Sequence, residues 1–520
     1  MAVLEAGTAP DSPRIGTAGG PHGAEAGTEP RGFHAGWPWL LAGAVLVWAT
    51  LLVLVEGPIA ARERVFLVLG VLGAWRYGWA LLHLVRALAF LRIVMPRKRA
   101  RARRADIAAE IDHVYAVVCS FGIPAWQFRA VYRSLIENCL ATGLPATIVA
   151  SITSDRDCAI LDELFAEAGR PADLRIVAQF QRGTGKRDAI AMALRTIARK
   201  NPSARSATLM LDGDVVLTPG ALAESLRFFA ADPGLAALTT NNDARLAPGD
   251  PSADWYRLRF AQRHLMMSSL ALSDRLLVLT GRFSVYRTPH LVDAQTIELI
   301  QNDAVDNWLH GRIRLLSGDD KSMWYAILRR GGRMLYLPHV YAVSFEAMPR
   351  GAGFLAGSTR LMLRWFGNMI RANGRSMRLG PRRCGPFLWW CLLDQRLSVV
   401  TTQFGFATAL AIAVGKDVRF VVVYLAWLFV SRSLLALIYG GLWGRVVPSW
   451  PVLLAYTQIW GSALKLYLFF RPDRQAWTRQ LIRRGGGDRG ARLAATTLYL
   501  LTVGTIAGAA AATAHIVAGG

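Results

Sequence analysis

Cysteine is scarce in this chain of 520 residues, and so is negative charge. The five cysteines form no CxxC pair and no even-numbered framework; they are Cys119, Cys139, Cys158, Cys384 and Cys391. This spacing indicates neither a structural zinc site nor a disulfide scaffold, and a reducing compartment is expected. Lys and Arg number 60 against 36 Asp and Glu, an excess that would favour nucleic-acid binding on a soluble surface. The basic residues instead gather beside long apolar stretches, which predicts a membrane protein with no nucleic-acid partner.

A signal-peptide pattern is also missing from the first 36 residues, which have neither a charged start nor an apolar core. They are rich in Gly, Ala, Pro and Thr. Such a segment cannot bury enough surface to offset its ordering entropy. Residues 1–36 are therefore predicted to form a disordered cytoplasmic tail.

Hydrophobic residues make up 53% of the chain and concentrate in long segments. Residues 37–55 and 65–91 are each long enough to cross roughly 30 Å of hydrocarbon. Six positive charges and no acid follow in residues 95–104, which predicts that this end lies in the cytoplasm. Residues 105–345 are then expected to be cytosolic.

The C-terminal third has four more apolar segments, at about 386–415, 418–440, 450–470 and 491–517. Residues 471–492 carry seven Arg and two Asp, so they should be cytoplasmic, but three full crossings would place them outside. Lys465 lies midway along residues 450–470, where a lipid-facing charge is costly. That segment is predicted to be interfacial or re-entrant, which gives five crossings and an external Gly520. Six spans with a local exception to the charge rule remain the alternative.

Residues 111–345 alternate short β-rich apolar runs with amphipathic helical stretches, the latter at 125–141, 156–169 and 187–199. Repeated β-α units predict an α/β domain with a mostly parallel, doubly wound sheet. In such sheets ligands bind at the carboxyl ends of the strands. The polar residues at those ends are therefore the candidate site residues.

Two candidates could contact a nucleotide. Asp155 follows the predicted strand at 146–152 and could accept a hydrogen bond from a base, although Ser-Asp is also an ordinary helix N-cap. Lys186 and Arg187 follow a glycine turn at the mouth of a helix, which suits a phosphate-bearing ligand about as well as a solvated surface. A Walker loop is excluded, because Phe180 replaces its first Gly and no Ser or Thr follows the Lys.

The sequence LMLDGDVVL places Asp212 and Asp214 directly after an apolar strand. Two carboxylates at this spacing can turn toward one hard cation and the diphosphate that it bridges. The sequence thus predicts a divalent-cation site, for Mg²⁺ first and Mn²⁺ second. The alternative is an acidic hairpin turn, in which Asp-Gly is common.

The sequence LLSGDDKSMW places Asp319 and Asp320 ahead of a helix. One carboxylate could cap the helix and orient its neighbour, while the other could act as general base toward a substrate hydroxyl.

No acid occurs from Ala347 to Leu393, whereas Arg360, Arg364 and Arg371 share one face of a predicted helix. Asn373-Gly374 is expected to end that helix. One interpretation is a cationic helix on the inner leaflet. The other is a wall of guanidinium groups facing a diphosphate and an acidic polymer, and the two are compatible.

Taken in order, these motifs are more specific than any one alone. Asp155, KRDA, DGD, GRFSVYR, WLHGRIRLLSGDDK and LMLRW, flanked by apolar spans, resemble the processive family 2 glycosyltransferases, the hyaluronan and cellulose synthases. The resemblance covers most of the chain. The stretches GDDKSMWY, RLMLRWFGNMIRANGRSMRL and LWWCLLDQRLS resemble the alginate polymerases of this family still more closely.

The resemblance implies a GT-A domain inserted in an α-helical transmembrane bundle. It assigns roles to residues that match family motifs: Asp155 and Lys186 to the nucleotide, Asp212 and Asp214 to the sugar diphosphate and its metal, Asp320 with Asp319 to the acceptor 4-hydroxyl, Arg364 to the leaving diphosphate and Trp365 to the sugar. The family's QxxRW motif begins with Gln, where this chain has Leu361, and Arg360 is the candidate substitute.

Residues 461–480 resemble the interfacial helix and gating loop of the hyaluronan synthases. The resemblance implies that Trp477, Thr478 and Arg479 close over the bound donor and exclude water.

The implied reaction is inverting polymerisation of mannuronate from GDP-mannuronate into β-1,4-polymannuronate, coupled to export across a bacterial inner membrane. The implied partners are a separate PilZ-type cyclic-di-GMP-binding membrane subunit, periplasmic export proteins and membrane lipid. One alternative is a synthase of another β-linked polysaccharide that uses a UDP-sugar. Others are a transporter or channel with a nucleotide-binding regulatory domain, and a receptor that binds nucleotide without chemistry.

The expected organisation has seven parts. They are the tail (1–36), two transmembrane helices (37–94), the cytosolic GT-A domain (95–345), cationic interfacial helices with LMLRW (346–384), two transmembrane helices (385–440), an interfacial helix with gating loop (449–490) and a last transmembrane helix (491–517).

Overall fold

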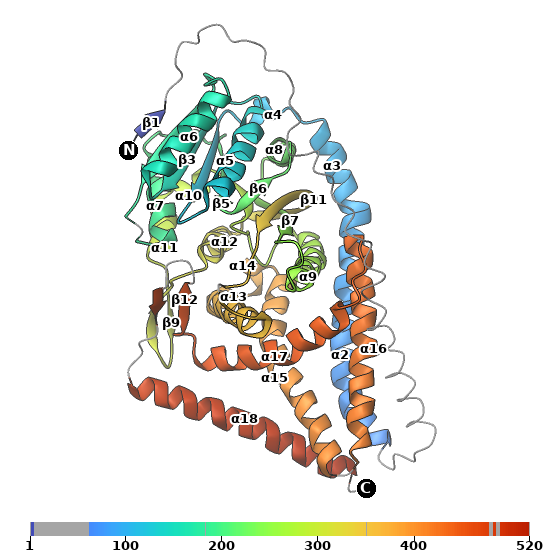
Figure 1. The fold of residues 1–520 in the computed structure, drawn as a ribbon. Helices are drawn as coiled ribbons and strands as arrows, with labels where there is room; N and C mark the ends of the chain where they lie inside the picture. The colour runs from blue at the N-terminus through green and yellow to red at the C-terminus, as the bar shows by residue number, and fades with distance from the viewer. Residues whose placement is uncertain are drawn as a thin grey trace.

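The computed structural model describes residues 2–4, 62–182, 184–349, 351–415, 417–477, 482–484 and 489–518. The first predicted span and most of the predicted tail lie outside these ranges, and so do Thr478 and Arg479. Figure 1 shows a sheet domain at one end of the molecule and long helices at the other.

The sheet domain is built on a sheet of nine strands in the order β1-β4-β3-β2-β5-β8-β7-β11-β6. The strands are β1 Ala2–Leu4, β2 Val114–Cys119, β3 Ala146–Ile152, β4 Leu174–Phe180, β5 Ala207–Asp212, β6 Val215–Leu217, β7 Leu235–Arg245, β8 Phe283–Arg287 and β11 Arg333–Phe345. Strands β2 to β5 pair in parallel, and β8 runs antiparallel between β5 and β7. All seven residues of β3 are buried, as expected for a strand covered on both faces.

Helices cover both faces of the parallel part. Helix α5 (Ala125–Leu140) and helix α6 (Asp155–Glu167) connect β2, β3 and β4 in one direction, and helix α7 (Lys186–Ala198) returns the chain to β5 on the other side of β2. Because such crossovers are right-handed, α7 lies on the face opposite to α5 and α6. The order in which strands are added therefore reverses between β2 and β5. The carboxyl ends of these two strands flank the crevice where doubly wound sheets bind ligands.

The rest of the sheet domain places the later motifs beside this crevice. Its elements are α4 Ile107–Glu110, α8 Ala221–Ala231, α9 Ala253–Ala271, α10 Pro289–Val292, α11 Ala294–Gln301, the hairpin of β9 Ala304–Asn307 with β10 Gly311–Arg314, and α12 Asp319–Arg329. Helix α9 packs against β7 and β11 and also against the long helices, so it joins the sheet to the membrane part.

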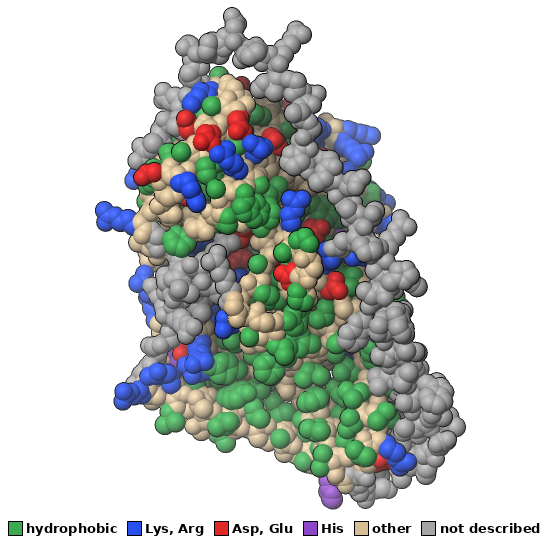
Figure 2. Space-filling view, viewed as in Figure 1, with side chains coloured by type: hydrophobic (Ala, Val, Ile, Leu, Met, Phe, Trp, Pro, Cys, Tyr) green, Lys and Arg blue, Asp and Glu red, His purple; other side chains and the backbone are tan. Residues whose placement is uncertain are grey.

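Within the described ranges, four helices are long and apolar enough to cross a membrane: Gly73–Arg103, Pro386–Gly415, Arg419–Trp443 and Arg489–His515. The first combines α2 (Arg62–Ala89), η2 (Phe90–Val94) and α3 (Met95–Arg103), and the others are α15, α16 and α18 (Arg489–Ala518). Apolar side chains cover the lower part of the molecule, where Figure 1 places α15 and α18 (Figure 2). The spans expected after residue 62 are therefore present as candidate membrane helices.

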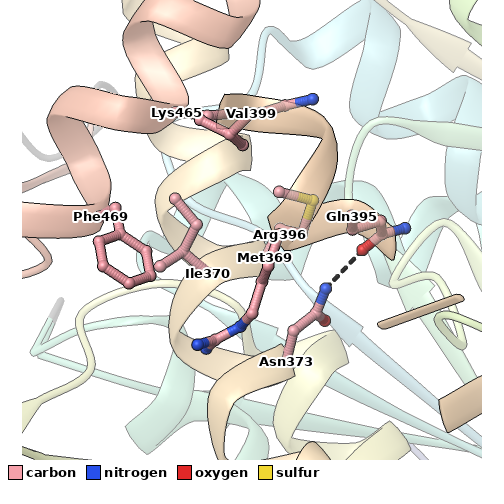
Figure 3. A pocket seen from close by; sticks show the side chains of 8 residues that line it. All are labelled: Met369, Ile370, Asn373, Gln395, Arg396, Val399, Lys465 and Phe469. Carbon is pink, nitrogen blue, oxygen red and sulfur yellow. Dashed lines mark hydrogen bonds between the residues drawn. The ribbon is translucent and has the colours of Figure 1, made fainter. Parts of the chain in front are cut away.

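Helix α17 (Trp450–Phe470), predicted to be interfacial, is not among those four helices. It lies with α13 (Phe354–Met377) between the sheet and α18 (Figure 1). The Lys465 ammonium lies 4.7 Å from the centre of the Phe366 ring on α13. It also lines a cavity of about 20 Å³ between α13, α15 and α17 (Figure 3). Lys465 thus contacts protein, and five crossings remain the prediction.

The expectation that α13 ends at Asn373-Gly374 is wrong, because the helix continues to Met377 and is followed by α14 (Gly380–Cys384). Asn373 is buried, and its side-chain amide donates to Gln395 Oε1 at 2.5 Å (Figure 3). A Cβ atom on Gly374 would come within 2.7 Å of the Arg396 guanidinium. The two residues that usually terminate helices are here used for close packing against α15.

Candidate active site

The DGD sequence lies at the crevice between β2 and β5. Asp212 is the last residue of β5 and pairs in register with Cys119, the last residue of β2. A Cβ atom on Gly213 would lie 2.7 Å from the Cys119 carbonyl oxygen, so only glycine fits in this turn. A Cβ atom on Gly281 would lie 2.9 Å from Asp212 Oδ1. Strand β6, which follows, pairs with β11 and not with β5, so DGD is not a hairpin turn.

Lys186 joins the two acidic motifs. It is the first residue of α7, and its Nζ lies 2.6 Å from Asp212 Oδ1 and 2.8 Å from Asp319 Oδ2. Burial lowers the pKa of Lys186, but the two carboxylates outweigh it and raise this pKa well above its usual value. Lys186 is therefore a fixed positive charge at the end of β5. Asp212 and Asp319, which are 107 positions apart in the chain, both form ion pairs with Lys186.

Asp319 and Asp320 begin α12, directly after Gly318, whose φ of 87° is in the left-handed region. Asp320 Oδ1 accepts a hydrogen bond from Lys321 N at 2.8 Å, and both carboxylates lie in the first turn of the helix, where negative charge is favourable. Asp319 is buried, and Asp320 is half-buried. Burial and the neighbouring charge of Asp319 raise the pKa of Asp320, which strengthens it as a proton acceptor.

The two nucleotide candidates besides Lys186 differ in placement. Asp155 is exposed in the first turn of α6, where Ser154 Oγ, and not Asp155, accepts the capping bond from Asp157 N. Asp155 is thus available at the carboxyl end of β3. Arg187 is buried and does not join the acidic cluster, because its guanidinium donates to Ile300 O and Ser317 O at 2.8 and 3.0 Å. Its position indicates support of the loop before α12.

A buried carboxylate beneath α12 carries no recognisable signal in the sequence. Asp303 is 2% exposed and accepts from Arg375 Nη1 at 2.5 Å and from Ser322 Oγ. Arg187 Nη1 lies 3.9 Å away. No motif or spacing distinguishes this aspartate from surface acids in the sequence. It connects α7, α12 and α13 and so holds the elements that carry Lys186, Asp320 and the helix with Arg364.

We expect Asp303→Ala to destabilise the fold by about 3–5 kcal/mol, because it leaves the buried guanidinium of Arg375 without its partner. Thermal unfolding of the detergent-solubilised chain should show a clearly lowered midpoint. Asp306→Ala, an exposed change in β9, is the matched control. Equal midpoints for the two variants would contradict the structural role of Asp303.

Helix α13 brings the LMLRW motif to the same loop. Ser317 Oγ donates to Asn368 Oδ1 at 2.9 Å, and Arg364 lies one turn earlier on the same face. Trp365 stacks on Trp255 of α9, with ring centres 5.6 Å apart and planes at 22°. Leu361 is buried in an apolar cluster with Trp255 and neighbouring residues.

Leu361 stands where the family motif has Gln, and packing explains this difference, because leucine fills an apolar space there. Arg360, the candidate substitute for the missing glutamine, is exposed.

The segment after α17 is anchored beside the site. Gln475 accepts from Leu316 N and donates to Arg314 O, both at 2.9 Å, and His310 Nε2 lies 2.8 Å from Phe470 O. Gln475 begins β12 (Gln475–Trp477), which pairs with β13 (Ile482–Arg484). The predicted lid residue Trp477 thus lies on a strand connected to the loop before Asp319.

Comparison with known proteins agrees with this arrangement. Residues 113–368 match the family model described as glycosyltransferase like family 2. Glycosyltransferase alg8 of Pseudomonas syringae pv. tomato (strain ATCC BAA-871 / DC3000) is 38% identical over 422 residues, 81% of this chain and 85% of the relative. Glycosyltransferase alg8 of Azotobacter vinelandii is 34% identical over 449 residues, 86% of this chain and 90% of the relative.

Among solved structures, the mannosyltransferase PcManGT from Pyrobaculum calidifontis in complex with GDP-Man and Mn²⁺ aligns with a TM-score of 0.44 and 17% identity, covering 73% of this chain and 99% of that one. GalNAc-T7 with UDP, GalNAc and Mn²⁺ aligns with a TM-score of 0.30 and 13% identity, covering 45% of this chain and 44% of that one. The family match, the curated relatives and the motifs beside the crevice between β2 and β5 agree. The sheet domain has the GT-A fold, and the chain belongs to the family 2 glycosyltransferases, in the alginate-polymerase group of the alg8 proteins.

Proposed function

We propose that this glycosyltransferase polymerises mannuronate from GDP-mannuronate into β-1,4-polymannuronate, processively and coupled to export. One observation carries the proposal: Lys186 holds Asp212 of the donor motif and Asp319 of the acceptor motif within 3 Å of one ammonium group. The two halves of a transfer reaction therefore share a single crevice. A regulatory nucleotide site in a transporter or receptor would not need the carboxylates of α12 there.

Asp320 is the proposed general base. Its raised pKa and its place in the first turn of α12 let it take the proton from the acceptor 4-hydroxyl as that oxygen attacks the anomeric carbon. The bond to the donor diphosphate breaks on the opposite side, so configuration inverts. Lys186 and Arg364 then stabilise the negative charge that develops on the leaving GDP.

The residues present fit a divalent cation, Mg²⁺ or Mn²⁺, held by Asp212 and Asp214. In the part of the chain that the structure describes, no group of three or more His, Cys, Asp or Glu could hold a metal ion alone. Mg²⁺ in nucleotide sites is typically held by one or two carboxylates, with the substrate phosphates and water completing its shell. When bound, the cation would supply further neutralisation of the diphosphate.

The remaining assignments are proposals that rest on the family. The sheet domain is cytoplasmic, the chain lies in the bacterial inner membrane, and Trp477, Thr478 and Arg479 close over the donor. The anchoring of Gln475 to the loop before Asp319 supports a lid at that place. A PilZ-type cyclic-di-GMP-binding subunit and periplasmic export proteins are the proposed partners.

A donor screen tests the proposed function. Membranes containing the full chain are incubated with radiolabelled GDP-mannuronate, GDP-mannose, UDP-glucose or UDP-N-acetylglucosamine, and membranes without the chain give the background. We expect polymer only from GDP-mannuronate. Polymer from a UDP-sugar would instead favour another β-linked polysaccharide, and GDP binding without transfer would favour a receptor or a regulated transporter.

We expect Asp214→Ala to abolish metal-dependent donor binding, because Asp214 is the second carboxylate of the DGD motif that is proposed to hold the cation. Calorimetry with donor and Mg²⁺ on the purified chain measures this. Asp250→Ala, in the loop before α9, should bind as the wild type does. Unchanged donor affinity in Asp214→Ala would mean that DGD has no role in donor binding.

A further inference from the structure

Arg259 on α9 is half-buried. Among the residues that the structure describes, no acid forms an ion pair with its guanidinium, which lies against two aromatic rings: its Cζ lies 4.2 Å from the centre of Trp365 and 5.2 Å from that of Trp255. Burial lowers the pKa of Arg259 to about 10, and the charge of Arg282 adds to this effect. The group stays positively charged at neutral pH.

Glu346 is the acid whose charge acts on the pKa of Arg259, and it already has hydrogen-bond partners of its own. Glu346 Oε1 accepts from Arg282 Nη2 at 2.5 Å and from Ser344 Oγ at 2.9 Å. An unpaired cation removed from water is costly, and stacking on aromatic rings offsets only part of that cost. Stacking also leaves the edge of the guanidinium, which carries its N–H groups, available to a ligand.

The position of Arg259 relates it to the acceptor. It lies over Trp365, the residue proposed to support the sugar ring, and α9 carries Arg263 one turn further on the same face. Arg263 donates to Asn242 Oδ1 at 2.5 Å. The negative charge of Asp320 partly offsets the effect of burial, which lowers the pKa of Arg263. Arg257, two residues before Arg259 and on another face of α9, pairs with Asp254 at 3.7 Å.

We propose that Arg259 binds the carboxylate of a uronate residue at the acceptor end of the polymer while Trp365 supports its ring. This inference rests on the proposed function and names the residue that selects an acidic polymer. A guanidinium can hold a carboxylate through two parallel hydrogen bonds, which a neutral hexose does not offer. Arg259 would therefore favour a uronate chain over a neutral chain of the same linkage.

The test compares two acceptors of equal length, a β-1,4-mannuronate hexasaccharide and its carboxyl-reduced, neutral counterpart. Binding to the full chain in detergent is measured by calorimetry. We expect Arg259→Gln to weaken mannuronate binding roughly tenfold and to leave binding of the neutral hexasaccharide and of GDP unchanged. Arg259→Lys should recover part of the loss, and Arg257→Gln, on the same helix, should bind as the wild type does.

Two results would overturn the inference: equal wild-type affinity for the two hexasaccharides, or an equal loss for both in Arg259→Gln, which would mean that Arg259 only packs α9 against α13. The wild-type comparison decides the matter even if the variant fails to fold, since it needs no substitution. Incorporation from GDP-mannuronate is measured in the same preparation. Incorporation with no acceptor preference rejects this inference alone, whereas no incorporation rejects the proposed function.

Discussion

Asp320→Asn should reduce polymer synthesis by about 10²–10⁴-fold, because the variant keeps the size of the side chain and loses the proton acceptor. GDP affinity and the unfolding midpoint should stay at wild-type values. Incorporation of mannuronate by membranes, with GDP binding measured on the purified chain, gives both quantities. Asp306→Asn, an exposed change on β9, is the matched control and should leave synthesis unchanged.

The pH dependence adds a second test of the same assignment. Burial and Asp319 raise the pKa of Asp320, and the base must be ionised to act. Synthesis should therefore fall as the pH drops through a value above that of an ordinary aspartate. Wild-type synthesis by Asp320→Asn, or an acid limit at the ordinary value, would reject Asp320 as the base.

Arg364→Lys should be nearly as damaging as Arg364→Ala, with a loss of about 10²-fold in turnover. A guanidinium fork can hold two phosphate oxygens, whereas an ammonium group offers a point charge. Steady-state turnover with GDP-mannuronate measures the effect.

Arg378→Lys, an exposed change at the end of α13, is the control for Arg364. If Lys at position 364 restored most of the turnover, Arg364 would act through charge alone, as an anchor to the inner leaflet would.

The local elements could be predicted well from the sequence, because each depends on neighbouring residues. The predicted strand at 146–152 is β3, and the helices expected at 125–141, 156–169 and 187–199 are α5 to α7 with shifts of one or two residues at their ends. The DGD and GDD carboxylates were found because strand ends and helix starts have recognisable patterns.

Contacts between distant segments could not be predicted in this way. Nothing in the spacing of Lys186, Asp212 and Asp319 shows that the first bridges the other two. Adjacency in the sequence groups Arg187 with Lys186, but one helical residue turns the side chain by about 100°. That turn directs Arg187 into the core. Arg259 carries no motif at all, and only its stacking on Trp365 distinguishes it from other arginines.

The central claim is that this chain transfers mannuronate from GDP-mannuronate by base-assisted, inverting attack in the crevice around Lys186. The anomeric configuration of the bond formed by the purified chain tests it most directly. After incubation with ¹³C-labelled GDP-α-mannuronate and a short mannuronate acceptor, the one-bond carbon–hydrogen coupling at the new anomeric carbon distinguishes the two outcomes. We predict a β-1,4 bond. An α bond, or no bond from this donor, would contradict the account.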